Sequence, residues 1–324
     1  MPALSVLAYE EPLTRPDVPH QPVLLDETLE LLRAPTGATI VDATLGPGGH
    51  AEALLSRVGR DGRVIGIDRD PAALAFARAR LARFGDRFEA LHGDYRKIAS
   101  LLEGTKVDGV LGDLGVSSYQ LDDPSRGFSF STEGPLDMRM DPHSGGPTAA
   151  SLVATLDAYE LKNIIATWGE ERLAGAIARA IVRERSKRAI ETTRELASLV
   201  ERVAGPAARR YRIHPATRTF QALRIAVNLE IEGIPDFVDG AVSLLRPGGR
   251  LAVISFHSLE DRAVKTSMHG LAHRCVCPPG LPVCGCGREN IVRVVTTRPV
   301  TPGPDETAAN PRARSAKLRV VERL

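Results

Sequence analysis

The sequence has few cysteines, no long apolar run and almost no excess of charge. All four cysteines among the 324 residues fall between positions 275 and 286. No disulfide framework is therefore spread over the chain, which favours the cytoplasm. No apolar run approaches bilayer-spanning length, and residues 1–20 carry acidic residues and prolines where a signal peptide has a basic start and an apolar core. The net charge of +2 excludes little, because basic residues can still cluster locally. We expect a cytoplasmic protein without a membrane segment.

Residues 39–58 are the first stretch whose pattern indicates a ligand site. A β-branched apolar run at 39–41 leads into glycines at 46, 48 and 49, and Ala51, Leu54 and Val58 follow at helical spacing. This order of strand, loop and helix is typical of a nucleotide-like ligand site in a doubly wound α/β domain. Asp42 to Gly48 reads D-x-x-x-G-x-G, the usual opening of an S-adenosylmethionine site, whereas a dinucleotide site has G-x-G-x-x-G. A tight turn without a ligand is the alternative.

Three further predicted strands end in or next to an acidic residue. They cover residues 63–68, 88–92 and 107–113, and the acids are Asp68, Asp94 and Asp113. The carboxyl ends of parallel strands share one edge of a sheet, where open α/β sheets bind ligands. Asp68 lies 22 residues after Gly46, where an acidic side chain accepts both ribose hydroxyls. Tyr95 is predicted to lie against an adenine ring and Asp94 to accept the adenine amino group, although both also suit ordinary loop positions.

A long insertion separates the fourth strand from the fifth. The fifth strand, predicted at 250–256, follows more than a hundred residues later, whereas an ordinary crossover is far shorter. Asp157 with Glu160 and Thr192 with Glu195 predict helix starts within this segment. We therefore expect a helical substrate-recognition subdomain at 128–212, a sheet domain formed by 20–127 and 213–324, and a flexible tail at 1–19. In this division, 217–232 and 235–245 return to the sheet domain.

Apolar and polar residues alternate at 291–297 and 317–322, and this pattern predicts a final antiparallel pair of strands. Such a pair distinguishes a methyltransferase-type sheet from a simple dinucleotide-binding one.

Several long sequence strings carry a specific family resemblance. They are residues 20–25, 46–50, 66–71, 113–118, 120–123, 126–130, 134–141, 214–221, 255–262 and 310–315. With these strings the chain resembles the ribosomal RNA small-subunit methyltransferase H family from about residue 20 to its end. The resemblance implies a Rossmann-like fold and S-adenosylmethionine-dependent methylation of the N4 amino group of a decoding-centre cytidine in 16S ribosomal RNA. It also implies small-subunit ribosomal RNA as the partner. We expect this RNA within the assembled subunit, with naked RNA as the alternative, and a homodimer is a further possibility. The cofactor contacts that it implies are Gly48, Gly49, His50, Asp68, Tyr95, Asp113 and Gln120.

Asp113 is the predicted catalytic residue. A cytosine amino nitrogen is a poor nucleophile, and positive charge grows on it as it attacks the sulfonium methyl group; a carboxylate that accepts its N–H stabilises that charge. Many amino-methyltransferases have Asp/Asn-Pro-Pro-aromatic here, but this chain has Asp113-Leu114-Gly115-Val116. Whether Asp113 faces the amine, the methionine portion of the cofactor or both is therefore open.

The target base must leave its stack to reach the methyl group. Tyr119, Phe128 and Phe130 are candidates to hold it between their rings, with packing anchors as the alternative.

Three basic clusters predict a phosphate-binding surface. They lie at 183–188, 209–218 and 312–319.

The cysteines form two C-x-C pairs, Cys275 with Cys277 and Cys284 with Cys286. These are not the usual C-x2-C zinc knuckle. We predict no metal, although zinc remains open beside reduced thiols and disulfides.

Two other functions remain as alternatives: an NAD(P)-dependent oxidoreductase, and a non-catalytic RNA-binding or assembly factor on the same fold.

Overall fold

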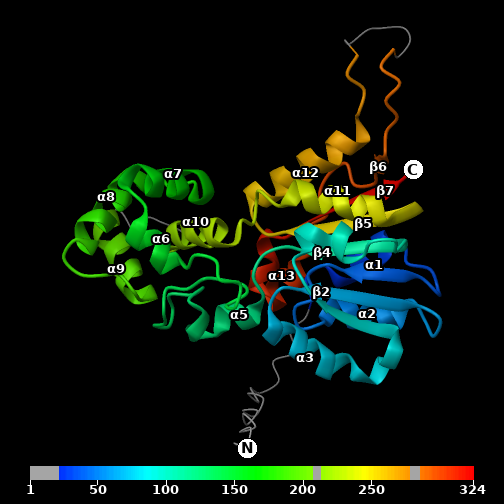
Figure 1. Cartoon of the computed structure of the whole chain (residues 1–324), viewed down its shortest axis with the longest axis horizontal. Coiled ribbons are helices and arrows are strands. Elements are labelled where there is room, and N and C mark those ends of the chain that lie inside the picture. Colours follow the sequence, from blue (N-terminus) through cyan, green and yellow to red (C-terminus); the bar gives the residue numbers. More distant parts are fainter. Residues whose placement is uncertain (1–21, 207–212, 278–284) are drawn as a thin grey trace, which may run out of the picture.

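A seven-stranded sheet forms the centre of the computed structural model, which describes residues 22–206, 213–277 and 285–324 (Figure 1). Its strands are β1 (Thr39–Asp42), β2 (Arg63–Asp68), β3 (Phe88–His92), β4 (Val107–Asp113), β5 (Leu245–Ser255), β6 (Val292–Val294) and β7 (Lys317–Arg323). The strand order is β3-β2-β1-β4-β5-β7-β6, in which β1 to β5 run parallel and β7 runs antiparallel to both of its neighbours. This confirms the predicted α/β class and the final antiparallel pair. The tail predicted at 1–19 lies outside the described residues.

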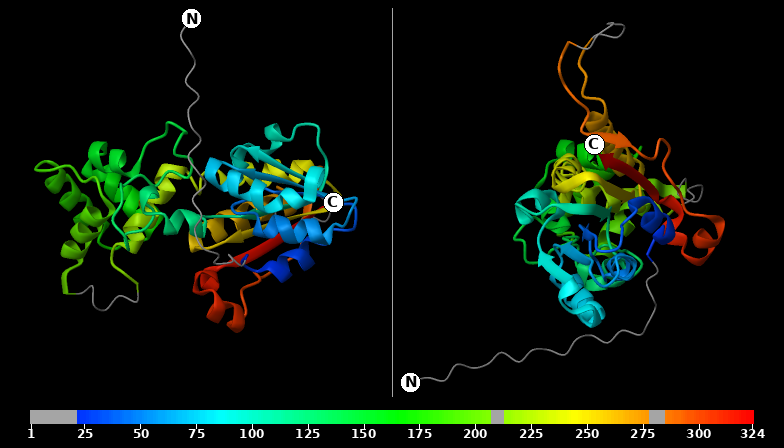
Figure 2. Two further views of the ribbon diagram at one scale, coloured as in Figure 1. Left: turned by 90° about the horizontal axis from the view of Figure 1, so that it is seen from below. Right: turned by 90° about the vertical axis from the view of Figure 1, so that its right-hand side faces the viewer.

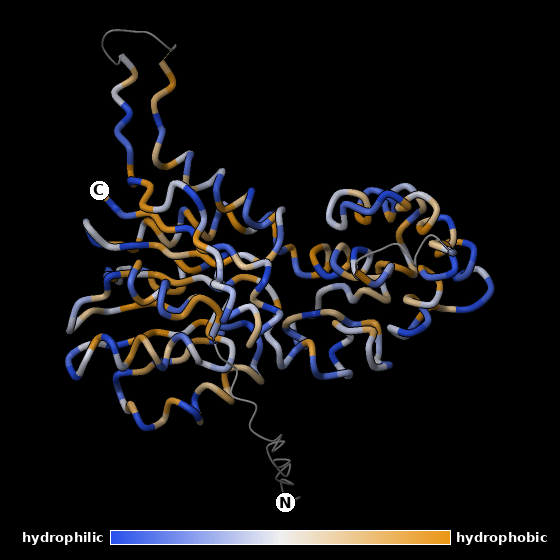
Figure 3. The backbone as a smooth tube through the Cα atoms, turned by 180° about the vertical axis from the view of Figure 1, so that it is seen from behind, coloured by the Kyte–Doolittle hydropathy of each residue, from blue (hydrophilic) through white to orange (hydrophobic). Residues whose placement is uncertain are grey.

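Helices cover both faces of the sheet because successive strand residues point to opposite sides. Val110 and Val253 belong to one buried core, and their neighbours Leu111 and Ile254 belong to the other. The first core is covered by α4 (Ile98–Leu101), α11 (Ile234–Leu244) and α12 (Ser258–Ala272), and the second by α1 (Leu25–Leu32), α2 (Gly49–Arg57) and α3 (Pro71–Leu81). Figure 3 shows the hydrophobic stretches running along the strands between these layers. Within the described ranges, no helix is long and apolar enough to cross a membrane.

A separate helical unit lies beside the sheet (Figures 1 and 2). Its helices are α5 (Ser118–Asp122), α6 (Ala149–Thr155), α7 (Ala158–Gly169), α8 (Ala174–Arg185), α9 (Thr193–Ala204) and α10 (Thr217–Asn228). Capping boxes start α7 at Asp157 with Glu160 and α9 at Thr192 with Glu195, as the sequence predicts. A third buried core, distinct from the two at the sheet, holds this unit together.

The structure places α10 in this helical core, whereas the sequence analysis assigned 217–232 to the sheet domain. Phe220, Leu223 and Val227, three to four residues apart on one face of α10, are buried in the helical core, and α10 packs on α7. Amphipathic spacing shows that a helix has an apolar face, but it does not show which core that face meets. The predicted boundary near 212 lies outside the described residues.

Strand β5 begins earlier than the predicted 250–256. Leu245 pairs with Val107 and Arg250 with Gly109, so the register shifts between the two pairs. The five-residue step on β5 contains Gly248 with φ +83°, a left-handed conformation that glycine adopts readily. Residues 245–249, before the predicted start, therefore form an irregular first part of the strand.

Short helical segments complete the described chain: η1 (Ala82–Arg87), η2 (Tyr95–Lys97), η3 (Pro124–Arg126), α13 (Pro304–Ala309) and η5 (Pro311–Ser315).

Candidate functional site

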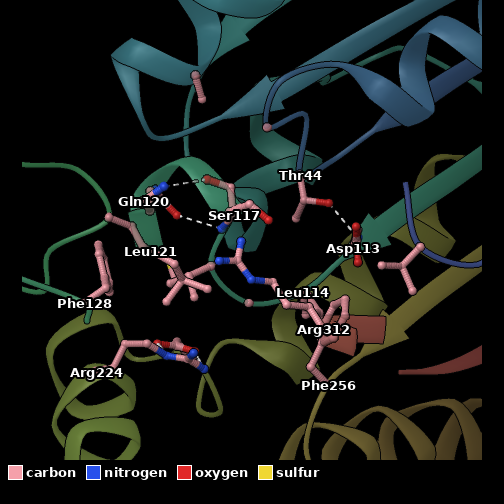
Figure 4. Close-up of a pocket in the computed structure, with 18 of the residues that line it drawn as sticks. Thr44, Asp113, Leu114, Ser117, Gln120, Leu121, Phe128, Arg224, Phe256 and Arg312 are labelled. Carbon is pink, nitrogen blue, oxygen red and sulfur yellow. Dashed lines mark hydrogen bonds and ion pairs between the residues drawn. The ribbon is translucent and has the colours of Figure 1, made fainter. Parts of the chain in front are cut away.

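A cavity of about 590 Å³ opens at the carboxyl ends of β1, β2 and β4. The glycine-rich loop and the ends of β2 and β4 form one side of it, and Phe128, Phe130, Phe220 and Arg224 contribute from the helical unit. Figure 4 shows residues of both units turned toward the same space. The cavity therefore lies at the sheet edge that the sequence indicates, and the helical unit forms its opposite wall.

The glycine loop between β1 and α2 is fixed to the end of β2. The Gly46 N–H donates to Asp68 Oδ2 at 2.7 Å, and the Asp70 N–H donates to Asp68 Oδ1 at 2.8 Å. Burial raises the pKa of Asp68 even though these N–H groups favour the ionised form. Each carboxylate oxygen keeps a further lone pair, so Asp68, which lines the cavity, is placed to accept ribose hydroxyls.

Gly48 plays a different part from the neighbouring glycines. Gly46 and Gly49 line the cavity, but Gly48 does not. A Cβ atom at Gly48 would come within 3.0 Å of Leu81 Cδ1 on α3, and its φ is +83°. Packing between α2 and α3 therefore accounts for this glycine in the structure. Its predicted cofactor contact stays a prediction.

Asp113 ends β4 inside the cavity wall. Its N–H donates to Thr44 Oγ1 at 2.6 Å (Figure 4). Its Oδ2 lies 3.7 Å from His50 Nδ1. The opposite ring nitrogen, His50 Nε2, lies 3.0 Å from the Val23 carbonyl oxygen; because that oxygen only accepts, Nε2 carries the proton. The second carboxyl oxygen, Asp113 Oδ1, is buried without a hydrogen-bond partner among the described residues. The Asp113 side chain is 22% exposed, and because Oδ1 is enclosed, the carboxyl oxygen that faces the cavity is Oδ2.

The pKa of Asp113 is raised well above its ordinary value. Burial is the main cause, and the nearby negative charges of Asp42 and Glu260 add to it. Burial likewise raises the pKa of Asp42, which lies behind the cavity wall, to about 7. Strongly perturbed carboxyl groups in a cleft are typical of functional sites, and this group is suited to a positively charged ligand.

Of the two neighbours Tyr95 and Asp94, only Tyr95 lines the cavity. Tyr95 lines the cavity, and its half-buried ring packs edge-on against Phe237 at a centroid distance of 5.1 Å. Burial raises the pKa of its hydroxyl, so the side chain is a neutral aromatic surface. The Asp94 carboxylate is bound by Arg96 and lies 3.8 Å from Arg69 Nη1, and it does not line the cavity. The predicted place against an adenine ring therefore suits Tyr95, and the structure does not place Asp94 for the adenine amino group.

Gln120 lines the cavity but already uses both ends of its amide. Its Oε1 accepts from the Ser117 N–H at 3.0 Å, and its Nε2 donates to Asp70 Oδ2 at 2.8 Å. The same Asp70 oxygen accepts from Arg126 Nη1 at 2.7 Å. This buried network, which the sequence analysis missed, joins the start of α3 to α5 and η3. Asp70 also caps α3, where its Oδ1 accepts from the Ala72 N–H at 3.0 Å.

A second charged group lies across the cavity and was also missed. Arg224 binds Glu230 through two hydrogen bonds, of 3.0 and 2.8 Å. Glu260 Oε2 accepts from the Phe256 N–H at 2.8 Å, and Glu260 Oε1 lies 3.2 Å from His257 Nε2. Burial opposes ionisation of Glu260, but His257 and Arg224 hold its pKa below the ordinary value. His257 and Glu260 fall within the string 255–262, whereas Arg224 and Glu230 lie outside every string that carries the resemblance.

The aromatic candidates are divided between the cavity and the surface. Phe128 and Phe130 line the cavity, and the Phe130 ring lies 4.5 Å from that of His214 and 4.8 Å from that of Phe220. Tyr119 instead packs on Phe76 and does not line the cavity. The structure therefore brings two of the three predicted rings to the site.

Comparison with known proteins decides the family. Residues 17–324 match the MraW methylase family. The chain is 53% identical over 321 residues to "Ribosomal RNA small subunit methyltransferase H" of Thermomicrobium roseum, covering 98% of this chain and 97% of that protein. The protein of the same name from Trichlorobacter lovleyi is 53% identical over 311 residues, covering 94% of this chain and 98% of the relative. The chain belongs to the MraW methylase family.

Membership of the MraW methylase family confirms the resemblance, and with it the prediction of an S-adenosylmethionine-dependent methyltransferase. The site fits that cofactor: the loop at 46–49 borders the cavity, Asp68 is placed for a ribose, and Tyr95 offers a neutral aromatic surface for a base.

The predicted basic clusters are only partly at the cavity. Arg312 lines it and binds Asp122 at 2.6 Å, whereas Arg319 binds Asp261. Arg185 donates to the carbonyl groups of Val153 and Leu156 and thus stabilises the helical unit. Residues 209, 210 and 212 lie outside the described residues.

Two groups of potential metal ligands occur in the described part of the chain. One is Glu230 with His257 and Glu260, where the bidentate Arg224 already neutralises Glu230. The other consists of Cys275, Cys277 and Cys286, none of which lines the cavity.

Proposed function

We propose that this protein transfers the methyl group of S-adenosylmethionine to the N4 amino group of a cytidine in small-subunit ribosomal RNA. The carboxyl group of Asp113, which lines the cavity at the end of β4 beside the glycine loop, carries this proposal. Family membership and the names of the curated relatives support the substrate class. The N4 position rests on the resemblance and on the chemistry below.

The sheet side of the cavity would hold the cofactor. Gly49 and His50 begin α2, so the helix N-terminus favours the polar methionine portion. Asp68 would accept the ribose hydroxyls, Tyr95 would pack against the adenine, and Gln120 would support this wall through Asp70.

Asp113 would act on the attacking amine. S-adenosylmethionine supplies the methyl group and leaves as a neutral thioether. Through its exposed Oδ2, Asp113 would accept one N–H of the amine, stabilise the charge that grows on nitrogen as the N–CH3 bond forms, and take up or relay the proton that is lost. Burial raises the pKa of Asp113, which makes it a stronger proton acceptor than an ordinary carboxylate.

The helical unit, with its wall of Phe128, Phe130 and Arg224, would hold the target nucleotide. A flipped cytosine needs an aromatic surface and hydrogen-bonding groups, and this wall offers both across the cavity from Asp113. This gives the helical unit the substrate-recognition role predicted for 128–212. We further propose that the substrate is the assembled subunit in the cytoplasm and that the enzyme acts as a homodimer.

Nucleoside mass spectrometry of small-subunit ribosomal RNA, with and without the protein, tests the proposed function. N4-methylcytidine is expected at one position only when protein and S-adenosylmethionine are both present. RNA binding without any methyl incorporation would indicate an assembly factor. Calorimetric binding of NAD in place of S-adenosylmethionine would indicate an oxidoreductase.

A further inference from the structure

Between α12 and β6, the described residues 273–277 and 285–291 form two legs that leave the sheet domain and return to it, and we call these two legs the arm. Figures 1 and 2 show its two described legs projecting from the sheet domain, away from the helical unit. The base is joined by the Ile291 N–H, which donates to Leu271 O at 3.0 Å, and by the Arg274 N–H, which donates to Asn290 Oδ1 at 3.2 Å.

Apolar burial does not hold the arm together. In the described ranges 273–277 and 285–290, every residue is exposed except Cys277 and Cys286, which are half-buried. A segment that buries so little apolar surface usually needs a covalent or metal crosslink to keep one conformation.

The cysteines lie where such a crosslink is needed. The Sγ atoms of Cys275, Cys277 and Cys286 all lie within 4.8 Å of one another, and those of Cys275 and Cys286 are 3.8 Å apart. A disulfide requires about 2.05 Å, so this pair is not bonded in that way. With a Zn–S bond of about 2.3 Å, two ligands of a tetrahedral zinc ion lie about 3.8 Å apart.

We infer that Cys275, Cys277 and Cys286 bind a structural zinc ion that fixes the arm. Zinc binds thiolates, and the ion offsets the charge that accumulates when three of them converge. Arg274 and Arg288, which flank the cysteines in the sequence, add positive charge that favours thiolates. The chain's remaining cysteine, Cys284, lies outside the described residues, and the inference does not depend on it. The site is also independent of the proposed function, because it lies outside the cavity.

The test is the zinc content of the full-length protein, purified under reducing conditions without chelator and measured by inductively coupled plasma mass spectrometry. One zinc per chain is expected in the wild type, and Cys275→Ser and Cys286→Ser should each lower the zinc affinity at least tenfold. His257→Gln is the matched control, because it alters the other potential ligand group, and it should keep its zinc. Wild-type protein without zinc, or zinc lost from His257→Gln and retained in the cysteine variants, would overturn the inference.

Cobalt substitution gives a second readout that does not depend on activity. Co²⁺ added to the metal-free protein is expected to produce thiolate-to-cobalt charge-transfer bands and intense tetrahedral d–d bands. Cys275→Ser should weaken both, while far-ultraviolet circular dichroism confirms that the protein is folded. Cobalt binding without thiolate bands would contradict the assignment.

Discussion

At the scale of single residues, the site is built on carboxyl groups kept out of water. Asp42 and Asp113 are close enough for each charge to disfavour the other, and Glu260 adds a third negative group. Such an arrangement costs stability in the empty protein, and a bound cation offsets that cost. The same property that weakens the folded state is therefore what suits the cavity to an amine that becomes positive as it reacts.

Stability should fall as the pH rises, because of Asp42. Its folded pKa of about 7 lies above the unfolded value, so the folded state binds the extra proton between about pH 4 and pH 7. The stabilisation from this residue is complete below the unfolded pKa and is lost as the pH rises through the folded pKa, by on the order of 4 kcal/mol. Urea unfolding of the wild type and Asp42→Asn at pH 5 and pH 8 should therefore show a smaller drop in the variant. Equal drops would mean that Asp42 is not held protonated.

Asp68 should contribute directly to cofactor affinity. Asp68→Ala removes the acceptor for the Gly46 N–H and for a ribose hydroxyl. Losing such bonds costs roughly 1.5–3 kcal/mol, or about ten- to a hundredfold in the dissociation constant of S-adenosylmethionine. Isothermal titration calorimetry provides the measurement. Asp94→Ala is the control: it also removes an acid that follows a strand, but one that pairs with Arg96 outside the cavity, and its affinity should stay close to that of the wild type.

At the scale of elements, local sequence signals were informative and long-range ones were not. Capping boxes such as Asp157 with Glu160 act within four residues, so they mark the true helix starts. The early start of β5 depends on how it pairs with β4. The position of α10 depends on which of the buried cores its apolar side packs into. Both are settled by partners far away in the sequence.

Arg126 should be essential for joining the elements around the cofactor wall. It donates to Asp70 and to the Met140 carbonyl oxygen, both at 2.7 Å, in a mostly buried position. Arg126→Leu leaves a buried carboxylate without its cation, which costs about 3–5 kcal/mol. Chemical denaturation measures this loss. Arg188→Leu, which removes an exposed ion pair with Glu195, should cost at most about 1 kcal/mol, and a similar loss in both variants would contradict the role of Arg126.

At the scale of the whole molecule, the cavity exists because two units with separate cores meet at one sheet edge. The sequence predicted the sheet side, since the acids that end parallel strands and the glycine loop are tied to that edge by topology. Arg224 and Glu230 could not be predicted as part of the same cavity. They lie on and just after α10, and no local sequence pattern shows that this helix faces the end of β4. Gly48 shows that a correct motif does not fix the role of each residue in it. The glycine-rich motif looks the same whether Gly48 contacts the ligand or allows α2 to pack against α3.

Methyl transfer in this account needs Asp113 on the sheet side and a target amine presented by the helical side. The decisive measurement is single-turnover methylation of small ribosomal subunits by Asp113→Asn at saturating S-adenosylmethionine, beside a calorimetric titration of the cofactor. The asparagine keeps the shape and one acceptor atom but removes the charge. We expect the rate of methyl transfer to fall by about a hundredfold or more, with cofactor affinity nearly unchanged. A wild-type rate, or a loss of affinity that accounts for the whole loss of rate, would contradict the assignment of Asp113 to the amine.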